Sequence, residues 1–228
     1  MTSAPADPGT TLQAVLFDMD GTLLDSEKVW DIALDDLAHE LGGSLSQAGR
    51  ARMVGTPLGR SIALLHDDLG IDADPESSGS FLLARTAELF SRPLSWKPGA
   101  RELLDAVGAA GVPAALVTST HRHLTELALR TIGAGRFKVS VCGDEVTATK
   151  PKPEPYLQAL RLLGLGPERC IAIEDSPVGL TSALEAGLPV LVVPSEVPVQ
   201  PQPRMTIRDT LVGVTVEDIA ALAMTGRR

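Results

Sequence analysis

Short, uninterrupted apolar runs recur along this chain, and such runs are typical of strands buried on both faces. They occupy residues 14–17, 114–117, 139–142, 170–173 and 190–193. Apolar residues at helical spacing fill segments between them, and each of these segments is followed directly by Gly, which commonly ends a helix: 100–110, 122–132, 154–163 and 178–186. The repeated alternation of strand and helix predicts an α/β fold, a parallel sheet with helices on both faces.

The region between the first two runs breaks this pattern. Residues 25–96 show helical periodicity at 27–41, 61–69 and 81–90, with a polar loop expected at 72–80, and contain no convincing buried strand. We therefore expect a helical domain at 25–96, inserted after the first strand of a core domain made of residues 12–24 and 97–228. Residues 1–11 are expected to form a flexible tail.

A proline-rich loop is expected at 194–203, after the last of the apolar runs. A final short strand and a helix are expected to follow it.

The charge pattern changes the range of partners to consider. The 228 residues carry 29 Asp and Glu against 20 Lys and Arg, a formal charge of −9. No long basic run occurs, so a nucleic-acid or anionic-membrane surface is excluded as a main function. The two cysteines, Cys142 and Cys170, lie in or beside apolar runs and are expected to be reduced and packed in the core.

The start of the chain lacks the basic and then apolar segments of a signal peptide. No apolar run approaches the roughly 20 residues that span a bilayer. We expect a soluble cytoplasmic protein, a monomer or weak homodimer, with no membrane partner.

Two carboxylates follow the first apolar run directly, in the segment Phe17-Asp18-Met19-Asp20-Gly21-Thr22. Strand residues two apart point to the same side, so Asp18 and Asp20 are expected at one point near the carboxyl end of the strand. Close carboxylates repel and need a cation or a shared proton between them. Oxygen ligands of this kind suit Mg²⁺. A strand running into an ordinary polar turn is the alternative interpretation of this segment.

Polar residues also follow three other apolar runs. Thr118 and Ser119 follow the run at 114–117, Lys150 lies in the loop after 139–142, and Glu174 and Asp175 follow 170–173. Ligands of an open parallel sheet bind outside the carboxyl ends of its strands, so these side chains are expected to converge. Taken singly, each has an ordinary alternative: a helix cap, a solvated loop lysine, or acids that complement a helix dipole.

With these residues in order, the chain resembles the haloacid dehalogenase superfamily, in its phosphatase branch with a helical (C1-type) cap. The resemblance rests on Asp18-Met19-Asp20-Gly21-Thr22, then Thr118, then Lys150-Pro151, then Glu174-Asp175 with Gly179 behind them. It covers nearly all of the chain beyond the first ten residues. It implies a Rossmann-like catalytic core, with the helical insertion as the cap.

The resemblance also implies a covalent mechanism with Mg²⁺ as cofactor. Asp18 would be the nucleophile that forms an aspartyl-phosphate, and Asp20 the acid and then the base. Thr118 and Ser119 would bind the phosphoryl group, and Lys150 would neutralise charge beside Asp18. The metal ligands would come from four positions, with Asp20 contributing its backbone carbonyl and Glu174 acting directly or through water: Asp18, Asp20, Glu174 and Asp175.

The implied activity is hydrolysis of a small phosphorylated metabolite: a sugar, deoxysugar or polyol phosphate, with phosphoglycolate also open. A β-phosphoglucomutase shares the motifs, but it usually carries His where this chain has Trp30 and Arg where Leu58 falls. A non-catalytic phosphate-binding regulatory module is the alternative from another class. Selectivity would lie in the cap, with Gly55, Thr56 and Arg60 as candidates for contacting the substrate.

Four aromatic or imidazole residues outside the motifs are interpreted separately. His121 and His123 are expected to be solvated or capping residues, since their helical spacing places them on different faces. His66 is expected at the surface of the cap. Trp30, near a cap junction, is expected to pack, with a place at the entrance to the site as its alternative.

Overall fold

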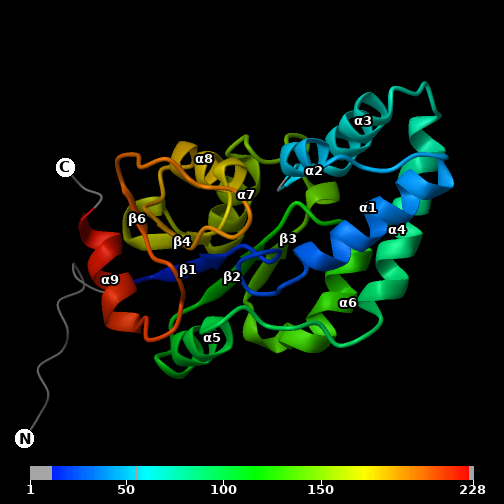
Figure 1. Cartoon of the computed structure of the whole chain (residues 1–228). Coiled ribbons are helices and arrows are strands. Elements are labelled where there is room, and N and C mark those ends of the chain that lie inside the picture. The colour runs from blue at the N-terminus through cyan, green and yellow to red at the C-terminus, as the bar shows by residue number, and fades with distance from the viewer. Residues whose placement is uncertain (1–11, 55, 226–228) are drawn as a thin grey trace, which may run out of the picture.

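A computed structural model describes residues 12–54 and 56–225 of the chain (Figure 1). Its centre is a six-stranded, wholly parallel sheet in the order β3-β2-β1-β4-β5-β6. The strands are β1 (Ala14–Phe17), β2 (Ala114–Val117), β3 (Val139–Val141), β4 (Cys170–Glu174), β5 (Val190–Val192) and β6 (Met205–Ile207). The five apolar runs and the final short strand are confirmed as this sheet.

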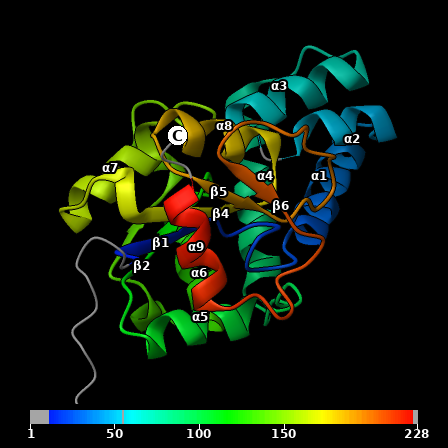
Figure 2. The same ribbon diagram turned by 90° about the vertical axis from the view of Figure 1, so that its left-hand side faces the viewer.

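Helices cover both faces of the sheet because alternate residues of each strand face opposite sides. On β1, Val15 and Phe17 face a core shared with α5 (Ala100–Ala109), α6 (Arg122–Ile132) and α9 (Val216–Thr225). Ala14 and Leu16 face α7 (Glu154–Leu163) and α8 (Pro177–Glu185). Figure 2, turned by a quarter, shows α5, α6 and α9 below the sheet and α7 above it.

Four helices lie between β1 and α5 in the chain: α1 (Glu27–Glu40), α2 (Gln47–Met53), α3 (Leu58–Leu69) and α4 (Pro75–Phe90). They share an apolar cluster of their own, which includes Leu37, Leu65 and Leu82. Phe90 and Leu94 instead join the cluster of the sheet, together with Trp30 of α1. This separate cluster supports the expected cap, and the exact domain boundaries stay a prediction.

The cap differs from expectation in two helices. Residues 75–80, expected as part of a loop, form the first turns of α4, which Asp74 caps by accepting from Ser77 N at 2.9 Å. Helix α2 was not expected at all; Ser46 caps it by accepting from Gly49 N at 2.9 Å. Three 3₁₀ turns complete the described elements: η1 (Ala134–Arg136), η2 (Gly143–Glu145) and η3 (Pro167–Arg169).

The expectation that His66 lies at the surface is wrong. His66 is 8% exposed, and its Nε2 lies 2.9 Å from the hydroxyl of Ser78, inside the contact between α3 and α4. Cys142 and Cys170 are buried and unpaired as expected. Burial raises the pKa of each thiol to about 11, which keeps both thiols protonated.

Within the described ranges, no helix is both long enough and apolar enough to cross a bilayer.

Candidate active site

Asp18 follows β1 at the centre of the sheet, where it is 6% exposed. Its Oδ1 accepts a hydrogen bond from Lys150 Nζ at 2.7 Å. Its Oδ2 is buried and has no hydrogen-bond partner among the residues that the structure describes. A buried carboxylate oxygen without a partner is costly, so this atom is open to an incoming ligand.

Lys150, 3% exposed, joins three strand ends through its ammonium group. Besides Asp18 it donates to Val117 O at 3.0 Å and to Glu174 Oε1 at 2.6 Å. Burial opposes its charge, but Asp18 and Glu174 outweigh burial and raise the pKa of Lys150, so it stays cationic. Tyr156 on α7 donates to the same Glu174 oxygen at 2.6 Å.

Asp18, Glu174 and Asp175 form a buried carboxylate cluster, with one oxygen of each lying within 4.8 Å of the others. Burial raises the pKa of Asp18 to about 7, against the opposing effect of Lys150. Burial, with Asp18 and Glu174 nearby, also raises the pKa of Asp175 well above its ordinary value. One ammonium cannot offset three carboxylates, so the cluster can hold a metal cation.

Two glycines leave room for this cluster. A Cβ on Gly21, whose φ is +78°, would lie 2.1 Å from Asp175 Oδ2. A Cβ on Gly179 would lie 1.9 Å from Glu174 Oε2. Both separations are far below van der Waals contact, so the two acids keep their places only beside glycine.

The side chain of Asp20 is held apart from the cluster by four donors. Oδ1 accepts from Ser26 Oγ at 2.6 Å and from Trp30 Nε1 at 3.2 Å. Oδ2 accepts from Thr120 Oγ1 at 2.7 Å and from Thr118 Oγ1 at 3.2 Å. The structure therefore does not bring this carboxylate into the metal-binding group, which leaves the backbone carbonyl as the expected ligand from Asp20.

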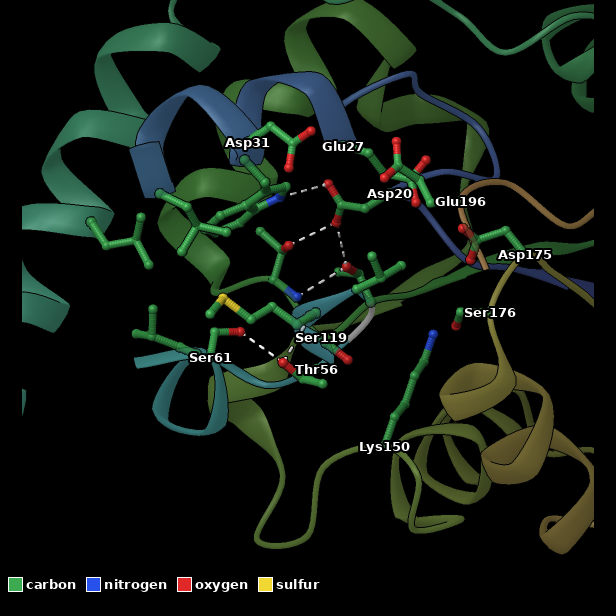
Figure 3. A pocket seen from close by; sticks show the side chains of 18 of the residues that line it. Asp20, Glu27, Asp31, Thr56, Ser61, Ser119, Lys150, Asp175, Ser176 and Glu196 are labelled. Atoms are coloured by element: carbon green, nitrogen blue, oxygen red, sulfur yellow. Dashed lines mark hydrogen bonds between the residues drawn. The ribbon is translucent and has the colours of Figure 1, made fainter. Parts of the chain in front are cut away.

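A cavity lies between this site and the cap, and its core side includes Asp18, Asp20, Thr118, Ser119 and Lys150. In Figure 3, Asp31, Thr56 and Ser61 lie across the cavity from Asp175 and Ser176. His121 and Trp30 also line the cavity. The ring of Trp30 packs edge-on against that of Phe90, with 6.2 Å between centroids, so Trp30 both packs and forms part of the cavity wall.

The expected cap residues have three different outcomes. Thr56 lines the cavity, and its hydroxyl lies 2.8 Å from Met53 O and 2.7 Å from Ser61 Oγ. Arg60 is exposed on α3 and is not among the residues that line the cavity. Gly55 lies outside the described residues.

Residues around the site that were not identified from the sequence include Ser26, Arg50, Thr120 and Tyr156. Thr120 carried a usable signal, since it lies two positions after Thr118 at the same strand end. Ser26 lies in the segment Asp25-Ser26-Glu27, beside the first motif. Arg50 and Tyr156 lie on helices with no motif around them.

Comparison with known proteins gives consistent matches. The sequence model of the haloacid dehalogenase-like hydrolases matches residues 12–187. A phosphorylated carbohydrates phosphatase from Thermotoga maritima is 33% identical over 78% of this chain and 82% of the relative.

Two solved structures show the same similarity. The structure of CbbY from Rhodobacter sphaeroides in complex with phosphate has a TM-score of 0.80 at 27% identity, covering 89% of this chain and 96% of that one. A putative β-phosphoglucomutase from Thermotoga maritima has a TM-score of 0.65 at 32% identity, covering 82% and 88%.

Proposed function

The chain belongs to the haloacid dehalogenase-like hydrolase family and is a phosphatase, and we propose that it hydrolyses small sugar, deoxysugar or polyol phosphates through a phosphorylated Asp18. The observation that carries the mechanism is the contrast at the end of β1. Asp18 has one oxygen fixed by Lys150 and one oxygen bare, whereas both oxygens of Asp20 are hydrogen-bonded.

In the first step, a carboxylate oxygen of Asp18 forms a bond to phosphorus while the bond from phosphorus to the ester oxygen breaks. Asp20 gives its proton to the leaving oxygen, which departs as an alcohol. Three of the four groups around Asp20 are hydroxyls, which can donate or accept, so the same surroundings can hold the acid with or without its proton.

In the second step, a water oxygen attacks phosphorus and its proton goes to Asp20. The bond between phosphorus and Asp18 breaks, which releases phosphate and restores both side chains. Thr118 lies beside Asp20 and can donate to a phosphoryl oxygen once its hydroxyl turns, while Lys150 keeps Asp18 oriented throughout.

The carboxylate cluster fits Mg²⁺, because hard oxygen donors of three side chains meet there and Asp18 also has a buried oxygen without a partner in the described part of the chain. Asp18, Asp175 and the carbonyl of Asp20 would hold the ion, with Glu174 supporting them from its bonds to Lys150 and Tyr156. Bound there, Mg²⁺ supplies positive charge against the phosphoryl oxygens.

Phosphate release from p-nitrophenyl phosphate and from a panel of sugar and polyol phosphates tests this proposal. We expect release that needs Mg²⁺ and stops on chelation, and an Asp18→Asn variant that keeps the circular dichroism spectrum of the wild type but has no turnover. Activity that survives chelation would contradict the metal assignment. An active Asp18→Asn variant would mean that the nucleophile lies elsewhere.

A phosphosugar mutase is the second candidate, favoured by the similarity to the putative β-phosphoglucomutase from Thermotoga maritima. Trp30 argues against it, because its Nε1 is committed to Asp20 and an indole cannot act as a base. Incubation with β-glucose 1-phosphate separates the two: we expect free phosphate to appear faster than glucose 6-phosphate.

A further inference from the structure

The cap side of the cavity has one cationic side chain against two carboxylates, so its net charge is negative. Arg50 of α2 lines the cavity and contacts Asp31 Oδ1 at 2.6 Å and Asp35 Oδ1 at 2.5 Å, both on α1. Two carboxylates thus offset one guanidinium. Among the described residues that line the cavity, Arg50 and Lys150 are the only Lys or Arg, and Lys150 is committed to Asp18 and Glu174.

We infer that the cap side of this cavity selects monophosphates whose far end carries hydroxyls and no negative charge, with Arg50 and Asp31 as specificity-determining residues. This inference rests on the proposed phosphatase function and deepens it. It favours sugar and polyol monophosphates over both bisphosphates and phosphoglycolate.

The repulsive part follows from the two aspartates. A second phosphate or a carboxylate placed against Arg50 would also meet Asp31 and Asp35, which lie within 2.6 Å of the same guanidinium. Glu27 and Glu196 add two more acids to the lining. The apolar wall made by Leu34, Met53, Leu58, Leu82 and Leu83 provides no compensating donors. An anionic group there would be desolvated beside a guanidinium whose charge two aspartates already offset.

The attractive part follows from the atoms that stay available. Arg50 bonds Oδ1 of Asp31, which leaves Oδ2 to accept from a hydroxyl. The guanidinium has five N–H groups and keeps donors beyond those used on the aspartates. Thr56 and Ser61 lie in the same wall; Thr56 donates to Met53 O, so Ser61 donates to Thr56 at 2.7 Å, and both oxygens keep lone pairs that can accept from a hydroxyl. Donors and acceptors that alternate in this way match a polyhydroxylated chain.

The test compares matched substrates that differ in far-end charge. The pairs are glucose 6-phosphate against glucose 1,6-bisphosphate, and 2-hydroxyethyl phosphate against phosphoglycolate. For the wild type we expect kcat/KM to be at least about tenfold higher for the member of each pair whose far end is uncharged. Equal values, or a preference for the anionic member, would overturn the inference.

Variants change the cap charge in both directions. Asp31→Asn leaves Arg50 with one carboxylate partner. We expect the ratio of kcat/KM between the substrate with the uncharged far end and the one with the anionic far end to fall by roughly tenfold. Arg50→Gln leaves the aspartates unopposed and should raise that ratio. Asp36→Asn is the matched control on the same helix, since Asp36 pairs with Arg85 and does not line the cavity. An Asp31→Asn ratio equal to that of Asp36→Asn would contradict the role given to Asp31.

The outcomes separate this inference from the proposed function. If the protein hydrolyses p-nitrophenyl phosphate and both members of each pair with equal kcat/KM, the inference alone is refuted. A protein that releases phosphate from none of them would refute the phosphatase proposal and this inference with it.

Discussion

At the scale of single residues, Asp18 and Asp20 are two positions apart but have opposite surroundings. Asp18 has a buried, bare oxygen and a raised pKa, which suits a group that awaits a cation and a phosphorus atom. Asp20 is fixed by donors from the core and from the cap, because Thr118 and Thr120 follow β2 while Trp30 belongs to α1. The orientation of the proposed acid therefore depends on the cap.

Trp30→Phe tests this dependence, because it keeps an aromatic ring against Phe90 and removes the N–H donated to Asp20, together with part of the indole ring. A lost hydrogen bond to a charged group corresponds to about 1.5 kcal/mol, so we expect kcat/KM for an alkyl phosphate to fall by about tenfold. The loss should be much smaller with p-nitrophenyl phosphate, whose leaving group needs no proton.

Trp96→Phe is the control at the other cap junction, where the ring lies under the Arg136 guanidinium at 5.8 Å. Its kinetics should match those of the wild type with both substrates. If Trp30→Phe slowed both substrates equally, Trp30 would act in packing and not in positioning the acid.

At the scale of elements, the turn after β1 positions the cluster of Asp18, Glu174 and Asp175 that we propose holds Mg²⁺. We expect Gly21→Ala to weaken Mg²⁺ binding and reduce activity at least about 100-fold, because its Cβ would displace Asp175. Gly42→Ala is the matched control: its φ is +81°, close to the +78° of Gly21, yet nothing lies within 4 Å of its Cβ. Gly42→Ala should lose about 1 kcal/mol of stability from its left-handed backbone, and Gly21→Ala at least as much, measured by denaturant unfolding. Equal activity in the two variants would contradict the steric argument.

The sheet was predictable because each strand is a short, continuous apolar run, and the motif residues were predictable because they follow those runs. Helix α2 was not predictable, since its seven residues contain a Gly and few apolar positions. The first turns of α4, Pro-Glu-Ser-Ser-Gly-Ser, also have low helix propensity. They become helical where Ser78 bonds His66 and Gly79 packs near Ile62, contacts that exist only after folding.

Tyr156 and Arg50 were also not predictable, because their contacts in the site are with residues distant in the sequence. Tyr156 reaches Glu174 across 18 positions from a helix face that looks like ordinary core, so nothing local marks it. The role proposed for Arg50 depends on its ion pairs with Asp31 and Asp35 of α1, and these pairs form only in the folded cap.

At the scale of the whole molecule, the carboxylate cluster links stability to pH and metal. Without metal, the folded state holds a proton on Asp18 up to about pH 7, whereas the unfolded chain releases it near pH 4. The free energy of unfolding therefore falls as pH rises through this window, and Asp175 contributes in the same direction.

Asp18→Asn has no such proton to lose. In EDTA, we expect its Tm to gain a few degrees on that of the wild type between pH 5 and pH 8. Mg²⁺ should raise the Tm of the wild type more at pH 8 than at pH 5, because it binds the ionised cluster. A difference between the two proteins that stays constant with pH, or Mg²⁺ stabilisation that is larger at pH 5, would contradict this account.

The phosphorylated Asp18 is the central claim, and chemical trapping during turnover tests it most directly. Enzyme mixed with a phosphomonoester and Mg²⁺ is quenched within milliseconds and reduced with borohydride, which converts an acyl phosphate to an alcohol. Mass spectrometry of the peptide that carries both carboxylates should then show homoserine at position 18, only when substrate is present, and unmodified Asp20. Conversion at another residue, or full turnover with position 18 unchanged at every quench time, would contradict the account.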